Sequence, residues 1–351
     1  MRVLHLNLEK GWRGGERQTL LTLQGLQAAG HQIALAARAG SPLAQRAQAA
    51  GIPVHPCAGS AALVRVLLAQ RRAYDIIHAQ TAQAMSLLAV LRPCLSAALV
   101  FTRRTAFDAP DRARRQRWKW SRVDALVAIS QAAAAAPEAL GLPALVIPSA
   151  VLALPPDLPH VSVLRQRFAL EGRRVLVTAA ALSPEKDPLA LIEAVHLLRA
   201  DHPDIVCLHC GADGAAAELA RHRVQALGLQ DHYRFVGFQP QVADFLALAD
   251  VYVSSSRFEA LGTSVLDACL AGLPVVATDA GGHREILDPD RGLLAPIGDA
   301  AALARRIAWV LGHGDAAQAM AQRAQAHVAQ VYSVPVMVAA YERLYRQLRA
   351  A

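Results

Sequence analysis

Short apolar runs alternate with longer Ala- and Leu-rich stretches of helical period along most of the chain. In the first part of the chain this pattern predicts strands at residues 2–8, 31–38, 52–57, 75–80, 98–102, 125–130 and 145–150. Most of these runs are followed by a helical stretch. Such strand–helix alternation is typical of a parallel sheet with helices on both faces.

A Pro-rich segment at residues 151–160 has no helical period and is the best linker in the chain. The alternation then restarts, with strands expected at 173–180, 205–210, 233–238, 251–256 and 274–280. A chain of 351 residues is also too long for one ordinary core. We therefore predict an α/β protein of two Rossmann-like domains, residues 1–155 and 156–335, with the ligand in the cleft between them. The tail, residues 336–351, is predicted to be an amphipathic helix.

The positive charge belongs to the first half. Residues 1–155 hold 18 Lys and Arg against 7 Asp and Glu, whereas residues 156–351 hold 18 against 21. The densest basic stretch, residues 103–122, also carries two Trp. A solvated helix face explains it as well as contact with an anionic membrane or a phospholipid-linked acceptor does. Nucleic acid is not expected as a partner, because no recognition module is present.

The five cysteines have no disulfide framework spacing, which suits a reducing cytoplasm. Cys207 and Cys210 form a CxxC pair, but it lies in an apolar run without a second pair, so both are expected to be buried strand residues. The chain begins with a strand pattern rather than a signal peptide, and Arg92 and Pro93 interrupt the apolar stretch 85–101. We expect a cytoplasmic protein, peripheral at most to the inner face of the membrane.

The most informative stretch is RFEALGTSVLDACLAG, residues 257–272. Glu259 follows a predicted strand, and Gly262, Thr263 and Ser264 open a helix that contains Asp267. Free amides at the start of a helix, together with its dipole, suit a diphosphate. The two carboxylates are then placed to accept hydrogen bonds from hydroxyls at opposite ends of a sugar nucleotide.

Two further loops follow strands. Gly14 and Gly15 lie between the first strand and the first helix, where glycine lets a ligand approach the backbone closely. Lys186, in the segment SPEK, is a phosphate partner by its position, although a surface lysine would look the same.

Together these segments resemble the retaining family-4 glycosyltransferases of GT-B fold over the whole chain. The family motif is Glu, seven residues, Glu; here it is Glu259, seven residues, Asp267. The glycine pair, the lysine and the GGHRE segment, residues 281–285, match in order and placement.

The resemblance implies a role for each of these residues. Glu259 would hold donor-sugar hydroxyls, Asp267 the ribose hydroxyls and Lys186 the diphosphate. The amides near Gly262–Ser264 and Gly15 would contact phosphate, and residues 236–242, ending at Val242, would border the base. The terminal helix would pack back onto the first domain. The implied partners are a nucleotide-sugar donor and a glycan or lipid-linked acceptor, with no cofactor and no metal.

One departure concerns charge. The family carries an Arg five residues before the lysine, where this chain has Ala181. Arg17, Arg103 and Arg104 in loops of the first domain are expected to replace that cation or to contact the acceptor.

Other functions share parts of the pattern. A retaining glycosidase also pairs two carboxylates, but around one bond. A sugar-nucleotide epimerase of the same fold and a catalytically weak donor-binding protein remain open. Asp288-Pro-Asp290 resembles a metal motif but is expected on a surface turn.

Overall fold

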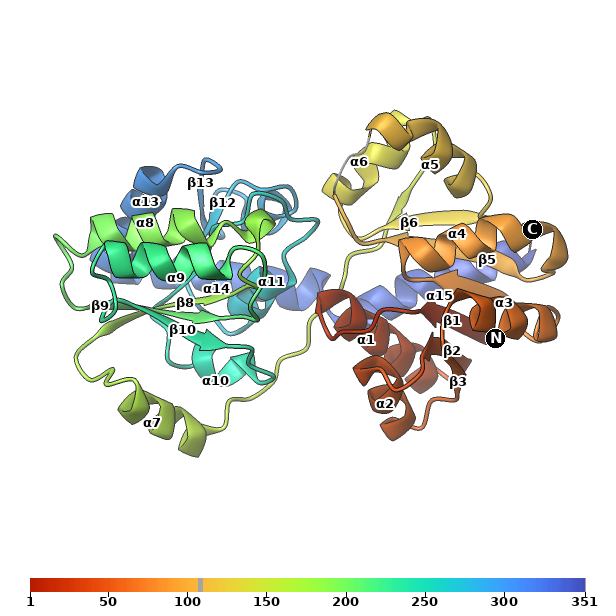
Figure 1. Ribbon diagram of the computed structural model, residues 1–351, viewed down its shortest axis with the longest axis horizontal. Coiled ribbons are helices and arrows are strands. Elements are labelled where there is room, and N and C mark those ends of the chain that lie inside the picture. The colour runs from red at the N-terminus through yellow and green to blue at the C-terminus, as the bar shows by residue number, and fades with distance from the viewer. Residues whose placement is uncertain (107–109, 351) are drawn as a thin grey trace. The chain divides into compact units, whose positions relative to one another are not determined.

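Two separate parallel sheets organise the chain. The computed structural model describes residues 1–106 and 110–350 and divides into one unit of Met1–Ala150 and Tyr332–Ala351 and a second of Val151–Val331 (Figure 1). The predicted α/β class is confirmed, with sheets of seven and six strands. The units meet in sequence at 150/151 and 331/332, a few residues before the expected positions at 155 and 335.

The first unit alternates strands and helices. The strands are β1 (Arg2–Asn7), β2 (Gln32–Arg38), β3 (Val54–Cys57), β4 (Ile76–Ala79), β5 (Ala98–Arg103), β6 (Ala125–Ala128) and β7 (Leu145–Val146), and the α-helices are α1 (Gly14–Ala28), α2 (Pro42–Ala49), α3 (Ser60–Ala69), α4 (Ala82–Leu91), α5 (Ala113–Trp120) and α6 (Gln131–Ala139). Side-chain hydroxyls begin several helices: Ser41, Thr81 and Ser130 each accept a hydrogen bond from the amide three residues on.

The order of this sheet is β3-β2-β1-β4-β5-β6-β7. From β1 the chain adds β2 and β3 on one side of the sheet, and it then returns to add β4 to β7 on the other side of β1. Side chains of β1 alternate between two separate cores. Val3 packs with α1 and α2 residues on one face, and Leu4 and Leu6 pack with α3 and α4 residues on the other. The sheet is therefore buried on both faces, as its apolar strands require.

The C-terminal helix α15 (Val334–Ala350) completes the first unit. It packs against α1, and the hydroxyls of its Tyr341 and Tyr345 reach Thr102 of β5 and His78 of β4 at 3.0 and 2.7 Å. The contact with α1 is close, since a Cβ atom on Gly25 would lie 2.5 Å from Cγ2 of Val338. Gly25 therefore lets the two helices approach each other.

The second unit repeats the design with the sheet order β10-β9-β8-β11-β12-β13. Its strands are β8 (Arg174–Ala179), β9 (Ile205–Cys210), β10 (Tyr233–Gly237), β11 (Val251–Ser254), β12 (Val275–Thr278) and β13 (Leu293–Ala295), and its α-helices are α7 (Leu158–Arg167), α8 (Pro188–Leu198), α9 (Ala217–Ala226), α10 (Val242–Leu246), α11 (Thr263–Leu270), α12 (His283–Leu287), α13 (Ala300–Gly312) and α14 (Gly314–Val331).

Two elements of the second unit differ from the sequence prediction. Helix α7 begins inside the segment that was expected to be a linker, because Asp157 caps it and Pro159 occupies its first turn, where proline is tolerated. Strand β13 was not among the strands predicted from the sequence. Among the described residues, no helix is both long and apolar enough to cross a bilayer.

Gly25→Ala should destabilise the protein by about 1–2 kcal/mol, because overpacking against Val338 outweighs the gain in helix propensity. In a double-mutant cycle measured by chemical unfolding, Val338→Ala should cost about 1 kcal/mol less in the Gly25→Ala background than in the wild type. Gly312→Ala is the control, since its Cβ would have no neighbour within 4 Å. Additive effects would contradict the close contact.

Candidate functional site

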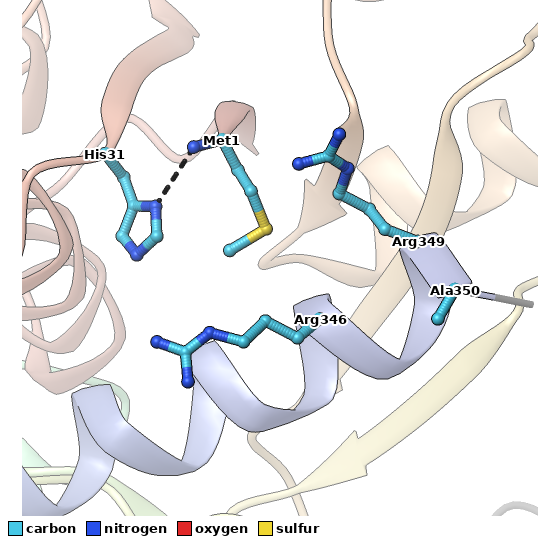
Figure 2. A pocket seen from close by; sticks show the side chains of 5 residues that line it. All are labelled: Met1, His31, Arg346, Arg349 and Ala350. Carbon is cyan, nitrogen blue, oxygen red and sulfur yellow. Dashed lines mark hydrogen bonds between the residues drawn. The ribbon is translucent and has the colours of Figure 1, made fainter.

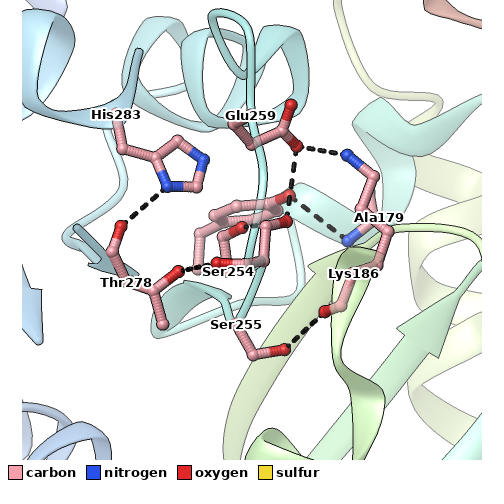
Figure 3. A network of polar contacts seen from close by, with 9 residues as sticks. Ala179, Lys186, Ser254, Ser255, Glu259, Thr278 and His283 are labelled. Atoms are coloured by element: carbon pink, nitrogen blue, oxygen red, sulfur yellow. Dashed lines mark hydrogen bonds and ion pairs between the residues drawn. The ribbon is translucent and has the colours of Figure 1, made fainter. Parts of the chain in front are cut away.

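The candidate site of the second unit lies where β8 and β11 run side by side. From these two strands the chain proceeds to β9 and β10 on one side and to β12 and β13 on the other. At such a switch point the two loops that follow the strands diverge and leave a crevice at the carboxyl edge. Lys186, after β8, and Glu259, after β11, both lie in these loops and form an ion pair (Figure 3).

Backbone and side-chain hydrogen bonds join the two loops. The amide of Arg257 donates to the carbonyl of Glu185 at 2.8 Å, and the hydroxyl of Ser255 donates to the carbonyl of Lys186 at 3.0 Å. The Arg257 guanidinium also donates to Asp187 at 2.7 Å. Asp187 caps α8 from a left-handed backbone conformation, with φ of 45°. Lys186 and Glu259 are thus held in adjacent positions.

The amino end of α11 lies in the same cluster. Gly262 precedes the helix with φ of 96°, a conformation that favours glycine. No side chain of the described residues caps this end of α11. The amides of the first turn, at Thr263 and Ser264, are therefore available to an anion, and the helix dipole favours negative charge there.

Tyr252 of β11 lies within electrostatic reach of both carboxylates of the motif. Burial raises the pKa of its hydroxyl well above the usual range, and the nearby carboxylates of Glu259 and Asp267 raise the same pKa further. The Tyr252 hydroxyl also accepts a hydrogen bond from the Ala179 amide at 3.3 Å and contacts the Ser264 side chain. The buried Tyr252 hydroxyl thus lies in the electrostatic field of both Glu259 and Asp267, and sequence reasoning missed this residue.

The GGHRE segment packs directly under the loop of Glu259. The Gly282 amide donates to the Glu259 carbonyl at 3.1 Å, and a Cβ on Gly282 would lie 2.4 Å from Cα of Leu261. Only glycine fits this approach. His283 follows, fully buried, with Nδ1 at 2.9 Å from the Thr278 carbonyl, and burial lowers the pKa of its imidazole.

The segment that lacks the expected arginine is tightly packed. The Ala180 carbonyl accepts a hydrogen bond from Nε2 of His209 at 2.9 Å, and a Cβ on Gly211 would lie 1.7 Å from that carbonyl oxygen. Ala181 follows in the same turn and brings no cation. Val242 begins α10 after β10, and β9 separates β10 from β8 in the sheet. It is not part of the Lys186–Glu259 cluster.

The first unit has its own switch point, between β1 and β4. Gly14 and Gly15 begin α1 directly after β1. Arg104, just after β5, lies beside them: a Cβ on Gly15 would be 3.9 Å from its Cδ. The Arg104 guanidinium donates to Oε1 of Gln80 at 2.6 Å and to Oγ of Ser149 at 3.3 Å. Arg104 is thus fixed at the carboxyl edge of the sheet.

The other two predicted arginines differ from Arg104. Arg103 is buried, donates to the Ala133 carbonyl at 2.5 Å, and lies over the Trp120 ring with its Cζ 5.5 Å from the centroid. Its side chain is therefore engaged in packing. Arg17 lies half-buried in the first turns of α1. Part of the basic stretch 103–122, residues 107–109, lies outside the described residues.

Cys207 and Cys210 lie in β9 and are buried, as predicted. Burial raises the pKa of both thiols, that of Cys210 to about 12, so neither is a ready nucleophile at neutral pH. In the described part of the chain, no three His, Cys, Asp or Glu side chains converge as metal ligands would. Asp288 and Asp290 are exposed on the turn that follows α12.

A separate hollow of about 370 Å³ lies in the first unit, lined by Met1, His31, Arg346, Arg349 and Ala350 (Figure 2). Met1 and His31 precede β1 and β2, so the hollow is at the amino edge of the sheet, opposite the glycine pair. His31 contacts both the Met1 amine at 3.3 Å and Glu342 at 2.8 Å. These bonds attach α15 to the sheet.

Two family models match the chain. Residues 162–327 match the family described as glycosyl transferases group 1, and residues 12–151 match the family described as glycosyltransferase family 4. The two matches together cover most of the chain. They include every predicted site residue, Gly14 and Lys186 among them.

Curated relatives are similar over part of their length. EpsD of Bacillus subtilis (strain 168), which carries a glycosyltransferase name, is 41% identical over 134 residues, or 38% of this chain and 35% of EpsD. The lipopolysaccharide core biosynthesis glycosyltransferase LpsE of Rhizobium meliloti (strain 1021) is 32% identical over 155 residues, or 44% of each chain. The aligned part thus spans less than half of each relative.

A solved structure is similar over the whole fold. Anabaena Alr3699/HepE, crystallised with UDP and glucose, superposes with a TM-score of 0.88 at 22% identity over 99% of this chain and all of the other. At this identity the likeness establishes the fold. The two sheets therefore have the GT-B architecture that the sequence predicted.

Proposed function

Because the chain belongs to the glycosyltransferases of group 1 and family 4, a family of transferase enzymes, we propose that it moves a sugar from a nucleoside-diphosphate sugar to a hydroxyl of a cell-envelope glycan or lipid-linked acceptor, such as lipopolysaccharide. One observation carries the proposal. The Lys186–Glu259 pair lies at the switch point of the second sheet, beside the uncapped amino end of α11. A cation, free amides and a carboxylate are what a sugar diphosphate needs.

Each part of this cluster has a separate task. Lys186 and the amides of Thr263 and Ser264 stabilise the negative charge of the departing diphosphate. Glu259 accepts hydrogen bonds from hydroxyls of the transferred sugar, and Asp267 accepts them from the ribose. Because protein groups meet the phosphate charge, transfer needs no metal and continues in the presence of a chelator.

The reaction proceeds with retention at the anomeric carbon. The acceptor attacks from the face that the diphosphate leaves, and a phosphate oxygen takes the acceptor proton, so no protein general base is assigned. In the first unit, the amides of Gly14 and Gly15 and the guanidinium of Arg104 bind anionic groups of the substrates. Arg17 is the second basic contact, and Val242 borders the base.

Incubation with UDP-glucose, UDP-N-acetylglucosamine or GDP-mannose should release free nucleoside diphosphate only when a lipid-linked or lipopolysaccharide acceptor is added. The expected product keeps the anomeric configuration of the donor, which proton NMR of the new linkage measures. Lys186→Ala should lower kcat at least tenfold, because one charge-assisted contact is worth about 1.5–3 kcal/mol.

Three outcomes would contradict the proposal. Acceptor-independent isomerisation of the sugar would indicate an epimerase. Tight donor binding without turnover on every acceptor would indicate a donor-binding protein. An inverted linkage would contradict retention while leaving transfer intact.

The carboxylates of the motif should be separable by substitution. Asp267→Ala should weaken binding of the free nucleoside diphosphate by about tenfold or more, because it removes the ribose contact. Glu259→Ala should spare that binding and lower kcat, because Lys186 and the α11 amides remain. Calorimetric titration and steady-state rates measure the two effects. The same defect in both variants would contradict the assignment of Asp267 to the ribose and Glu259 to the transferred sugar.

Helix α5 supports a location at the inner face of the membrane. Arg114, Arg115 and Arg117 are exposed there, and Trp118 is 45% exposed. The sequence from 112 to 123 contains no acid. Burial lowers the pKa of Lys119, and the neighbouring charges of Arg115 and Arg112 lower it further. Crowded cations beside an exposed Trp suit an anionic bilayer surface.

Arg114→Glu with Arg115→Glu should reduce binding to phosphatidylglycerol-containing vesicles more than tenfold, since each cation at the surface is worth about 1 kcal/mol. Co-sedimentation measures binding, with pure phosphatidylcholine vesicles as background. The matched control reverses the exposed pair Arg305 and Arg306 of α13, which changes the net charge equally. Equal losses in the two variants would mean that α5 is not the docking surface.

A further inference from the structure

His283 carries a buried hydrogen-bond acceptor next to the residues of the candidate site. Its Nδ1 lies 2.9 Å from the carbonyl oxygen of Thr278, and a carbonyl only accepts, so Nδ1 carries the proton. Burial lowers the pKa of this imidazole, which keeps the ring neutral at physiological pH. In that tautomer Nε2 has a free lone pair and no proton.

This Nε2 atom is buried and has no hydrogen-bond partner among the described residues. Figure 3 shows it on the side of the ring that faces Glu259, opposite the bond to Thr278. It also lies against the start of α11, because a Cβ on Gly262 would be 3.0 Å from it. A buried acceptor without a partner costs roughly 1–3 kcal/mol, so a partner in the working protein is expected.

The chemistry of the missing partner follows from its neighbours. Phosphate oxygens at neutral pH carry no proton to donate, so the diphosphate satisfies Lys186 and the α11 amides but not Nε2. A sugar hydroxyl or an amide N–H can donate to it. Glu259, the carboxylate with the strongest electrostatic effect on the ring, likewise accepts hydrogen bonds from hydroxyl groups. Donors and acceptors in this cluster therefore address different parts of one ligand.

We infer that His283 is a specificity-determining residue: Nε2 accepts a hydrogen bond from a hydroxyl or amide N–H of the transferred sugar, next to the hydroxyls that Glu259 holds. This inference rests on the proposed function. It selects donors that carry a hydrogen-bond donor at the contacted position. A sugar that lacks it would leave Nε2 unpaired and would be transferred poorly.

His283→Asn separates the two roles of the ring. The Asn amide can still donate to the Thr278 carbonyl from the position of Nδ1, but it provides no acceptor at the position of Nε2. His232→Asn is the matched control, since Nδ1 of His232 also donates to a carbonyl, that of Ile205, at 2.9 Å. His232 precedes β10, at the amino edge of the sheet and away from the site.

Binding of UDP, GDP and the sugar nucleotide that the wild type uses should be measured by calorimetry, and transfer by steady-state rates. We expect His283→Asn to bind the free nucleoside diphosphate as the wild type does. Its kcat/KM for the sugar nucleotide should fall about 3- to 10-fold, which corresponds to one neutral hydrogen bond. His232→Asn should match the wild type in both.

Deoxy derivatives of the donor sugar identify the contact. Removing one particular hydroxyl should lower kcat/KM in the wild type but cause little further loss in His283→Asn. Equal penalties for every deoxy sugar in both proteins would overturn the inference, as would an equal loss of free nucleotide and sugar nucleotide binding. A wild type that uses no sugar nucleotide would instead overturn the proposed function and this inference with it.

Discussion

The ion pair of Lys186 and Glu259 is the interaction on which the second unit's site depends. A partly buried pair contributes little net stability by itself, because desolvation offsets much of the attraction. The loops are therefore joined by other bonds, those of Arg257 with Glu185 and Asp187, which hold Lys186 and Glu259 next to each other. In the proposed function the diphosphate binds beside Lys186 and Glu259 accepts hydrogen bonds from sugar hydroxyls, so the phosphate and sugar contacts lie next to each other.

Close backbone packing fixes the geometry around that pair. Gly282 lies so near Leu261 and Ala260 that a side chain would collide with main-chain atoms, and Gly262 fits its φ of 96° next to the His283 ring. These glycines allow two loops to pack closely, whereas a glycine in a simple turn only allows the chain to reverse direction. The presence of glycine at 282 and 262 therefore follows from the same requirement that places His283 and Glu259 side by side. Loop precision here comes from main-chain contact rather than from side-chain packing.

The sequence was sufficient for the fold class and family but not for the side-chain network. Apolar runs such as 173–180 and 251–256 predicted strands because full burial in a parallel sheet leaves a continuous apolar signature. Strand β13 has three residues between two helices and is too short to give such a signature. Helix α7 was hidden by nearby prolines, of which Pro159 lies in its first turn. Tyr252 and His283 could not be assigned to the site from the sequence, because the residues around their polar atoms come from loops that are distant in the chain. The Arg103 side chain, by contrast, was assigned to a ligand although Trp120 and Ala133 engage it.

The two switch points use charge differently. In the second unit a carboxylate neutralises the cation directly, whereas the Arg104 guanidinium in the first unit is held by neutral oxygens of Gln80 and Ser149. Burial lowers the pKa of Arg104, while Tyr341 and Glu16 act in the opposite direction, and an arginine stays protonated. A fixed cation that is held by neutral groups keeps most of its electrostatic potential for an incoming anion. The excess of basic residues in the first half of the chain strengthens that potential further, which suits the anionic substrate groups proposed for the first unit. In the second unit the proposed selectivity rests instead on paired donors and acceptors.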